Sequence, residues 1–251
     1  ITYCDGTEVK HITQIGTGNY NEQTAKLYTD LSLMTANQDI AEEAAQVFNR
    51  LCMAQVMEET HHLLVAPKCL QNKVLDFIEE EICHADNNEP AYIGVKMNSL
   101  TDKTIIDKMV EASQHGVKID LVVRGICCLI PGIEGYTENI RVISIVGRYL
   151  EHSRIYIFGT PERDKMFISS ADFMTRNMVK RVEVATPIYD TAIKDRVRTM
   201  FGIMLHDTVK GRELCRDGNY YRREKPQEES EVISSQAYFS NEAYLAASKN
   251  V

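Results

Sequence analysis

The sequence predicts an α/β (α+β) fold in which a mixed sheet is flanked by helices. One observation is the alternation of strand, helix, strand, helix and strand between residues 61 and 125, which is typical of such a sheet. Another is composition: with 44% hydrophobic and 25% charged residues, a chain of 251 residues can form one or two globular domains. The third is a sequence layout that occurs twice and predicts pseudo-duplicated half-sites.

The duplicated layout joins a short polar loop to an acidic residue. The first copy reads Gly-Thr-Gly-Asn at residues 16–19 and continues to Asp30. The second reads Ser-Ser-Ala-Asp at residues 169–172 and reaches Glu183 at the same spacing, and only this copy has a histidine, His152, 20 residues before its fourth position. We expect a symmetric site shared by two related domains, with the matching first histidine lying before the first residue of the chain.

The first part of the chain is predicted to hold short strands and one helix. Residues 7–15 are predicted to form a strand that leads into the glycine loop, and residues 27–31 a second short strand. A helix is predicted over 37–58, because apolar residues recur there at helical spacing and Asn37 is a suitable N-cap.

After residue 60 the predicted elements alternate. The predicted strands are short and apolar, at 63–65, 91–97, 119–123, 140–146, 154–158, 165–169 and 181–185. The predicted helices lie at 68–85, 101–115 and 190–209. Gly116 follows the second of these helices, where glycine commonly ends a helix. From Arg216 the chain is polar and charged, and we expect a tail extended over the surface.

Charge and cysteine usage narrow the class of protein. A net charge of −8 argues against a general nucleic-acid-binding surface. The seven cysteines are odd in number and form no C-x-x-C pair, which favours buried, reduced thiols in a cytoplasmic protein and predicts no metal site. No apolar run approaches the ~18 residues of a membrane span.

His152 and Arg154 are the first candidates for chemistry. Two residues apart at the start of an apolar strand, they should point to the same face. Arginine offers a planar fork for phosphate oxygens, and histidine can act as a nucleophile, acid or base near neutral pH. The alternative is a surface pair on an edge strand; the downstream Asp172 and Glu183 favour the functional interpretation.

Other candidates have structural alternatives that the sequence leaves open. Arg124 ends a strand, where ligand-binding side chains gather in open α/β sheets, or it is a capping arginine. Lys96 and Asn98 share a strand face and could hold phosphate oxygens, but Asn98 and Ser99 could instead cap the next helix, and we expect Ser99 to do so. Tyr28 could stack on a base or belong to the core.

Eight segments together resemble one family, the bacterial polyphosphate kinases of the first type, in that family's order and over nearly the whole chain. These segments are IGTGNYNE at 15–22, LYTD at 27–30, VKMNSL at 95–100, LVVRGICC at 121–128, SIVGR at 144–148, EHSRIY at 151–156, SSAD at 169–172 and RVEVATP at 181–187.

The resemblance implies a fold and a reaction. The family's two C-terminal domains are phospholipase D-like, so residues 1–60 would be the remnant of the first and residues 61–251 the second with its polar tail. The family transfers the γ-phosphoryl group of ATP reversibly to inorganic polyphosphate through a phosphohistidine, with Mg²⁺. That histidine would precede Ile1, so we expect little or no kinase activity from this chain. The resemblance also implies a homo-oligomer when full-length, and a cytoplasmic location with peripheral association at the inner membrane.

The resemblance also implies roles for single residues. His152 would match the family's second histidine, an acid/base or phosphate ligand, and Glu183 would orient a catalytic histidine. Tyr28 would pack on adenine, while Arg124 and His152 would face the phosphates of ATP or ADP. Four further residues are candidate phosphate contacts: Lys96, Arg154, Asn19 and Asp172.

The chain departs from the family pattern at two positions. Gln14 stands where a histidine usually precedes Ile-Gly-Thr-Gly-Asn, and Phe173 stands where tryptophan is usual. Two other functions remain open: a phosphodiesterase or nuclease of the phospholipase D type, which would have H-x-K where this chain has H-x-R, and a non-catalytic module that binds polyanions.

Overall fold

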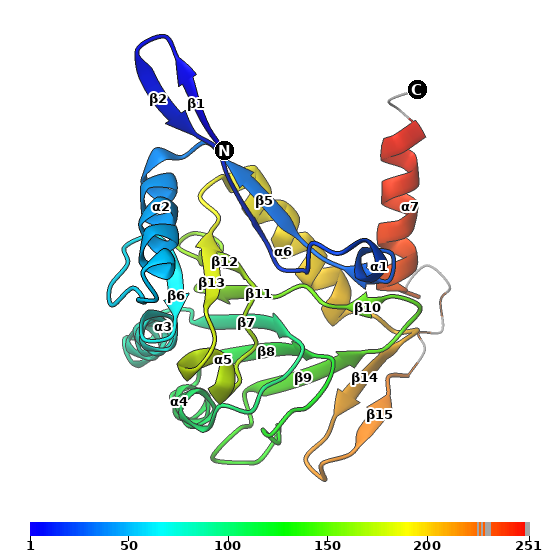
Figure 1. The fold of residues 1–251 in the computed structure, drawn as a ribbon. Helices are drawn as coiled ribbons and strands as arrows, with labels where there is room; N and C mark the ends of the chain where they lie inside the picture. The colour runs from blue at the N-terminus through cyan, green and yellow to red at the C-terminus, as the bar shows by residue number, and fades with distance from the viewer. Residues whose placement is uncertain (225, 227, 229–231, 249–251) are drawn as a thin grey trace.

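The centre of the molecule is a nine-stranded mixed sheet, seen in a computed structural model that describes residues 1–224, 226, 228 and 232–248 (Figure 1). From edge to edge its strands are β15 (Tyr220–Arg222), β14 (Gly211–Leu214), β9 (Ile140–Ile145), β8 (Lys118–Val123), β7 (Tyr92–Met97), β11 (Ile155–Phe158), β12 (Lys165–Ser169), β13 (Glu183–Pro187) and β6 (Leu64–Ala66). The β7–β8 and β8–β9 pairs are parallel, and the other pairs are antiparallel.

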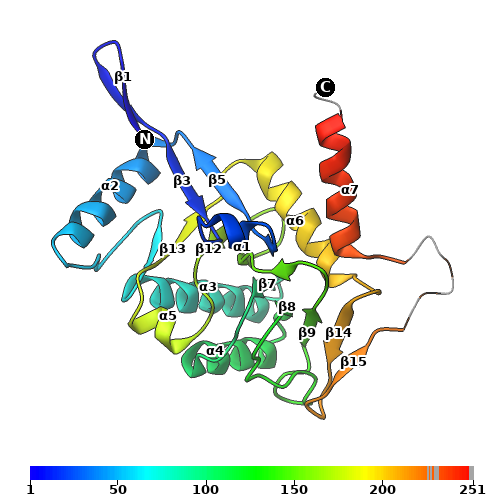
Figure 2. The ribbon, with the colours of Figure 1, turned by 45° about the vertical axis from the view of Figure 1, so that its right-hand side comes forward.

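Helices cover both faces of this sheet. The helices are α3 (Cys69–Asp86) and α4 (Lys103–Gln114) on one side and α6 (Thr191–Leu205) on the other, as Figures 1 and 2 show. Because successive strand residues point to opposite faces, Leu121 and Val123 join the core under α3 and α4, while Val122 joins the core with Phe201 of α6. The predicted fold class, a mixed sheet flanked by helices, is confirmed.

The first part of the chain lies against the sheet and also reaches away from it. Its elements are β1 (Thr2–Asp5), β2 (Glu8–His11), β3 (Thr13–Gly16), α1 (Glu22–Ala25), β4 (Tyr28–Thr29), β5 (Ser32–Thr35) and α2 (Gln38–Cys52). β1 and β2 form a projecting hairpin, and β3 pairs with β5 (Figure 1). Leu31 and Leu33 pack on the α6 side of the sheet, and Val47 of α2 packs on Val65.

The junction between α2 and the sheet is held by one buried carboxylate. Glu43 is 8% exposed and accepts hydrogen bonds from three successive backbone amides, those of His61, His62 (3.0 Å) and Leu63 (2.8 Å). These amides directly precede β6 and would otherwise be left without acceptors as the chain turns into the core.

Several predicted boundaries are corrected by the structure. The single strand predicted over 7–15 is β2 and β3, and the helix predicted over 37–58 ends at Cys52, although Asn37 is its N-cap as predicted. Ser99 does not cap α4. The cap is Asp102, which accepts from Ile105 N at 3.1 Å, because the chain is still extended at Leu100, where it bridges to two neighbouring segments.

The tail after Arg216 is not simply extended, which corrects the prediction. β15 pairs with β14, and a helix, α7 (Ser235–Ser248), projects from the body (Figures 1 and 2). Asp207, at the end of α6, starts α7 by accepting from the backbone N (2.8 Å) and the hydroxyl (2.6 Å) of Ser235. Part of the predicted tail, at 225, 227, 229–231 and 249–251, lies outside the described residues.

All seven cysteines are free thiols, but most are not buried, so that prediction was wrong in this respect. Cys69 is buried, whereas Cys4, Cys52, Cys83 and Cys128 are exposed. Within the described parts of the chain, no helix combines the length and the apolar character needed to cross a membrane.

Candidate active site

Strand ends bring the predicted site residues together at one end of the nine-stranded sheet. Because β7 and β8 are parallel, Lys96 and Asn98 at the end of β7 lie beside Arg124, which directly follows β8. β11 is antiparallel to β7 and its first residue pairs with Lys96, so His152 and Arg154 lie at the same end. The second copy of the duplicated layout lies at this end too, because β12 ends at Ser169 and β13 begins at Glu183.

His152 is held by the first part of the chain. Its Nδ1 lies 2.9 Å from Asp30 Oδ1, and its ring packs on that of Tyr28 with centroids 4.6 Å apart. The His152 backbone N donates to Thr29 O at 3.2 Å. A carboxylate can only accept, so the Nδ1 that faces Asp30 carries the proton and Nε2 keeps a lone pair. That lone pair lies 3.2 Å from Arg154 Nη1, which can donate to it.

A short pair of strands fixes this contact. β10 (Leu150–Glu151) pairs in parallel with β4, with Leu150 opposite Tyr28 and Glu151 opposite Thr29. His152 directly follows β10, and Asp30 directly follows β4. The two halves of the site are therefore joined along adjacent backbones, and the carboxylate partner of His152 is Asp30 rather than Glu183.

Arg154 is committed to protein partners. Its Nε and Nη2 lie 3.2 and 3.1 Å from the two carboxylate oxygens of Asp172, and its Nη1 donates to Thr17 O at 3.0 Å and His152 O at 2.8 Å. The Arg154 side chain is 8% exposed. Asp172 also accepts from Asn98 N at 2.7 Å. This placement gives Arg154 and Asp172 a part in holding the two halves of the site together, and their direct contacts with phosphate stay a prediction.

Lys96 is placed behind the site and not on its surface. Its side chain is 1% exposed, its ammonium donates to Ser153 O at 3.0 Å, and it forms an ion pair with Glu151 at 3.3 Å. Burial lowers the pKa of Lys96, and the Glu151 carboxylate opposes that shift. The placement therefore gives no support to the predicted phosphate contact.

Arg124 is the cation of this group that keeps its terminal nitrogens open. Its Nε donates to Asn98 Oδ1 (3.0 Å) and Glu151 O (3.2 Å), which orients the guanidinium. Neither Nη has a hydrogen-bond partner among the described residues. The Nδ2 of Asn98 is buried and also lacks a partner there. The Arg124 Nη nitrogens and the Asn98 Nδ2 are thus neighbouring donors without an acceptor among the described residues. The sequence predicts Asn98 as a phosphate contact or a helix cap, whereas in the structure its Oδ1 orients Arg124.

Glu183 makes a contact that the first half repeats. It accepts a hydrogen bond from Ser170 Oγ, while Asp30 accepts from Thr17 Oγ1 at 3.1 Å. Burial raises the pKa of Glu183, and the Ser170 bond opposes that shift. No histidine contacts Glu183 among the described residues. The duplicated layout is therefore a duplicated geometry, and it is the signal by which Asp30 could have been placed in the site from sequence.

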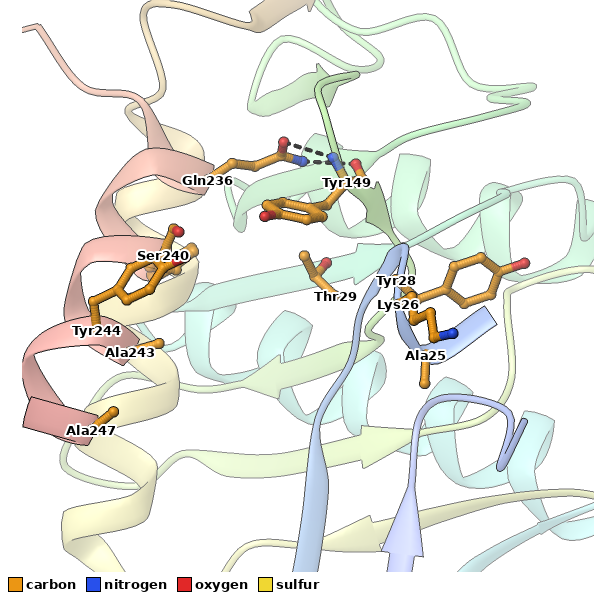
Figure 3. A pocket seen from close by; sticks show the side chains of 11 residues that line it. Ala25, Lys26, Tyr28, Thr29, Tyr149, Gln236, Ser240, Ala243, Tyr244 and Ala247 are labelled. Carbon is orange, nitrogen blue, oxygen red and sulfur yellow. Dashed lines mark hydrogen bonds between the residues drawn. The ribbon is translucent and has the colours of Figure 1, made fainter. Parts of the chain in front are cut away.

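A cavity of about 500 Å³ lies beside β4 (Figure 3). Tyr28 and Thr29 border it together with Tyr149 and residues of α1 and α7. Figure 3 shows the Tyr28 ring turned away from α7, in keeping with its contact with His152. Asn19 is exposed in the loop after β3. Gln14 is an exposed residue of β3 whose Nε2 donates to Ser32 Oγ at 2.9 Å.

Comparisons with known proteins place this arrangement in one family. A family model described as polyphosphate kinase C-terminal domain 2 matches residues 63–236, and one described as polyphosphate kinase C-terminal domain 1 matches residues 1–56. The polyphosphate kinase of Bacillus cereus is 50% identical over 214 residues, which are 85% of this chain and 30% of that protein. The polyphosphate kinase of Staphylococcus epidermidis is 48% identical over 236 residues, 94% of this chain and 32% of that protein.

A solved structure agrees with these sequence matches. The crystal structure of polyphosphate kinase from Porphyromonas gingivalis superposes on 99% of this chain and 38% of its own, with a TM-score of 0.88 and 35% identity. The chain spans about a third of the length of the curated relatives it matches. The matched family models cover most of the chain, and this chain therefore belongs to the polyphosphate kinase family.

Proposed function

We propose that this chain supplies the second half-site of a polyphosphate kinase, which transfers the γ-phosphoryl group of ATP reversibly to inorganic polyphosphate. The observation that carries the proposal is the open end of Arg124 beside His152. Phosphoryl transfer needs positioned positive charge more than covalent variety. A guanidinium held by its Nε, with both Nη nitrogens free of described partners, can bind phosphate oxygens in a fixed direction.

His152 would act beside Arg124, as a phosphate ligand or as an acid/base through Nε2. Its partner Asp30 fixes the ring and the proton on Nδ1, which is the arrangement that directed proton transfer requires. The family's phosphohistidine is assigned to no residue of this chain. Tyr28, packed on His152, would hold the adenine so that its phosphates extend toward Arg124.

Mg²⁺ would come with the nucleotide. Among the described residues, no group of three or more histidine, cysteine, aspartate or glutamate side chains could hold a metal ion. Asp172 is paired with Arg154, and Asp30 with His152. Mg²⁺ commonly keeps several waters and is bound through substrate phosphates, so we derive no step through a metal held by this chain.

Calorimetric titration of the chain with Mg-ATP tests the proposal. We expect binding by the unchanged chain and a loss of affinity of at least about tenfold in Arg124→Ala, because a charge-assisted contact with phosphate is removed. Arg222→Ala is the matched control, since Arg222 is an exposed arginine on the edge strand β15. Equal affinity in Arg124→Ala and Arg222→Ala would contradict the assignment of Arg124, and no binding by a folded chain would contradict the half-site itself.

A second measurement separates this function from its competitors. Hydrolysis of a model phosphodiester by the chain, lost in His152→Ala, would favour a phospholipase D-type activity over the kinase. Incubation with γ-labelled ATP is expected to leave the chain unlabelled. A label that resists base but not acid would show a phosphohistidine within this chain and overturn the assignment of that nucleophile elsewhere.

A further inference from the structure

Gln236, in the first turn of α7, reaches from that helix to the short strand β10 that directly precedes His152. Its Oε1 accepts from Tyr149 N at 3.1 Å, and its Nε2 donates to Tyr149 O at 2.8 Å and to Glu151 Oε1 at 2.7 Å (Figure 3 shows the bonds to Tyr149). The residue is 9% exposed. The side-chain amide thus pairs with the backbone of Tyr149, the residue directly before β10, as a neighbouring strand would.

The backbone opposite Gln236 is shaped to receive it. A Cβ added to Gly147 would lie 2.4 Å from Gln236 Oε1 and 2.8 Å from its Cδ. Any larger residue at this position would push the amide away, because real contacts of that kind do not come so close. Gly147 and Gln236 are therefore a complementary pair. Gly147 lies two residues before Tyr149, whereas Gln236 is distant from it in sequence.

Glu151 carries the effect of Gln236 into the site. Its carboxylate, 4% exposed, also accepts from Thr29 Oγ1 at 3.0 Å and pairs with Lys96, and its backbone O accepts from Arg124 Nε. His152 is the next residue. Removing the Gln236 amide leaves a buried carboxylate oxygen and the Tyr149 backbone groups without these partners, at the two-residue strand that aligns His152 with Asp30.

The other residues of α7 make fewer buried contacts with the body of the molecule. Ser235 is buried against Asp207, but residues 241–248 are exposed. The matched family model also ends at Gln236. Among the described residues, the hydrogen bonds from α7 to Tyr149 and Glu151 all come from Gln236, in the first turn of the helix.

We propose that Gln236 is a positioning residue for the second half-site, holding β10 so that His152 and Arg124 keep their geometry. The inference rests on the proposed function only for the consequence in nucleotide binding; the effect on His152 itself can be measured without a ligand. Gln236 touches no reacting atom, so its loss should change the site more than the fold.

The experiment uses hydrogen exchange of the His152 and Ser153 amides, which both donate to Thr29 O, in the chain as it stands. In Gln236→Leu and in Gly147→Ala we expect exchange at both amides to rise about tenfold, with no change in β7 and β8. Mg-ATP affinity should fall in parallel. Glu242→Gln, an exposed change on the same helix, is the control and should leave both quantities unchanged.

The double variant Gly147→Ala with Gln236→Ala tests whether the two positions act through one contact. We expect it to match Gln236→Ala alone, because no amide remains for the added Cβ to displace. Additive effects would overturn the pairing. Unchanged exchange at His152 and Ser153 in Gln236→Leu would overturn the inference, and so would equal acceleration throughout the sheet. Failure of the unchanged chain to bind Mg-ATP would count against the proposed function only, since the exchange result stands without it.

Discussion

Thr17 and Ser170, separated by more than half of the chain, make the same three hydrogen bonds. Each hydroxyl donates to the acidic residue of its half, Asp30 or Glu183. Each hydroxyl accepts from the amide that follows that acid, at 2.9 Å from Leu31 and 3.1 Å from Val184. Each backbone N donates to the carbonyl of the same following residue, at 2.8 and 3.0 Å. The relationship identifies the two acids as equivalent, although only Asp30 has a histidine beside it here.

The equivalence predicts matched losses of stability. Thr17→Ala and Ser170→Ala should each lower the free energy of unfolding by about 1–2 kcal/mol, because each leaves a backbone amide without its acceptor. Thr17→Ser keeps the hydroxyl and is the control. Urea unfolding of the three variants measures the effect, and a negligible loss in either alanine variant would show that the two contacts are not equivalent in energy.

Arg154→Lys should damage the fold more than Arg124→Ala does. A lysine keeps the charge but cannot reproduce the fork to Asp172 and the bond to Thr17 O together, so the loss should be below the about 3–5 kcal/mol that removing one partner of a buried pair costs. Thermal or urea unfolding should show a clear loss for Arg154→Lys and little for Arg124→Ala. The reverse order would contradict the structural role of Arg154.

The buried pair of Lys96 and Glu151 should show strong coupling. Lys96→Met leaves the Glu151 carboxylate without its cation and should cost about 3 kcal/mol or more. Adding Glu151→Gln to Lys96→Met removes the uncompensated charge, so the double variant should be more stable than the sum of the single effects predicts. A double-mutant cycle measured by urea unfolding checks this. Additive losses would show that the two charges do not depend on each other.

Glu183 and Asp207 should give opposite dependences of stability on pH. Burial raises the pKa of Glu183, so the folded chain binds that proton more tightly than the unfolded chain does, and this contribution is lost as pH rises through the folded pKa. The stability of Glu183→Gln relative to the unchanged chain should therefore be higher near neutral pH than in acid. Urea unfolding at both pH values tests the sign, and an unchanged difference would contradict the shift.

For Asp207 the sign is reversed. Burial alone would raise its pKa, but hydrogen bonds from Ser235, Lys210 and Gly211 outweigh burial and lower it below the ordinary 3.8. The stability that Asp207 supplies is then present above that value and lost as pH falls through the folded pKa. Asp207→Asn should be destabilised near neutral pH, with the difference shrinking in acid. A constant difference across this range would show that the charge of Asp207 is not what matters.

The sequence predicted the fold class and the duplicated layout because both depend on local spacing. The strands from β6 to β8 alternate with helices at lengths that leave few other arrangements, and equal spacing marked Asp30 as the counterpart of Glu183. The pairing of His152 with Asp30 could not be predicted in this way, since it depends on which backbones lie side by side across the halves.

A polar side chain can often pair with several partners, and this also limits what can be predicted from the sequence. From sequence, the Arg154 guanidinium could bind a phosphate or a carboxylate equally well. The packing of the folded chain places it on Asp172. The helix α7 escaped prediction because it shows no apolar stripe, and it is started by Asp207, a residue distant in sequence. Lys96 was placed on the correct strand face, but its depth depends on the closure of Glu151 and Ser153 over it.

The three amides gathered on Glu43 restrict how α2 can move relative to the sheet. Any swing of α2 away from the sheet has to break all three bonds at once and expose a carboxylate that is now shielded from water. A gradual hinge at this junction is therefore costly, and α2 should follow the sheet as part of one rigid body.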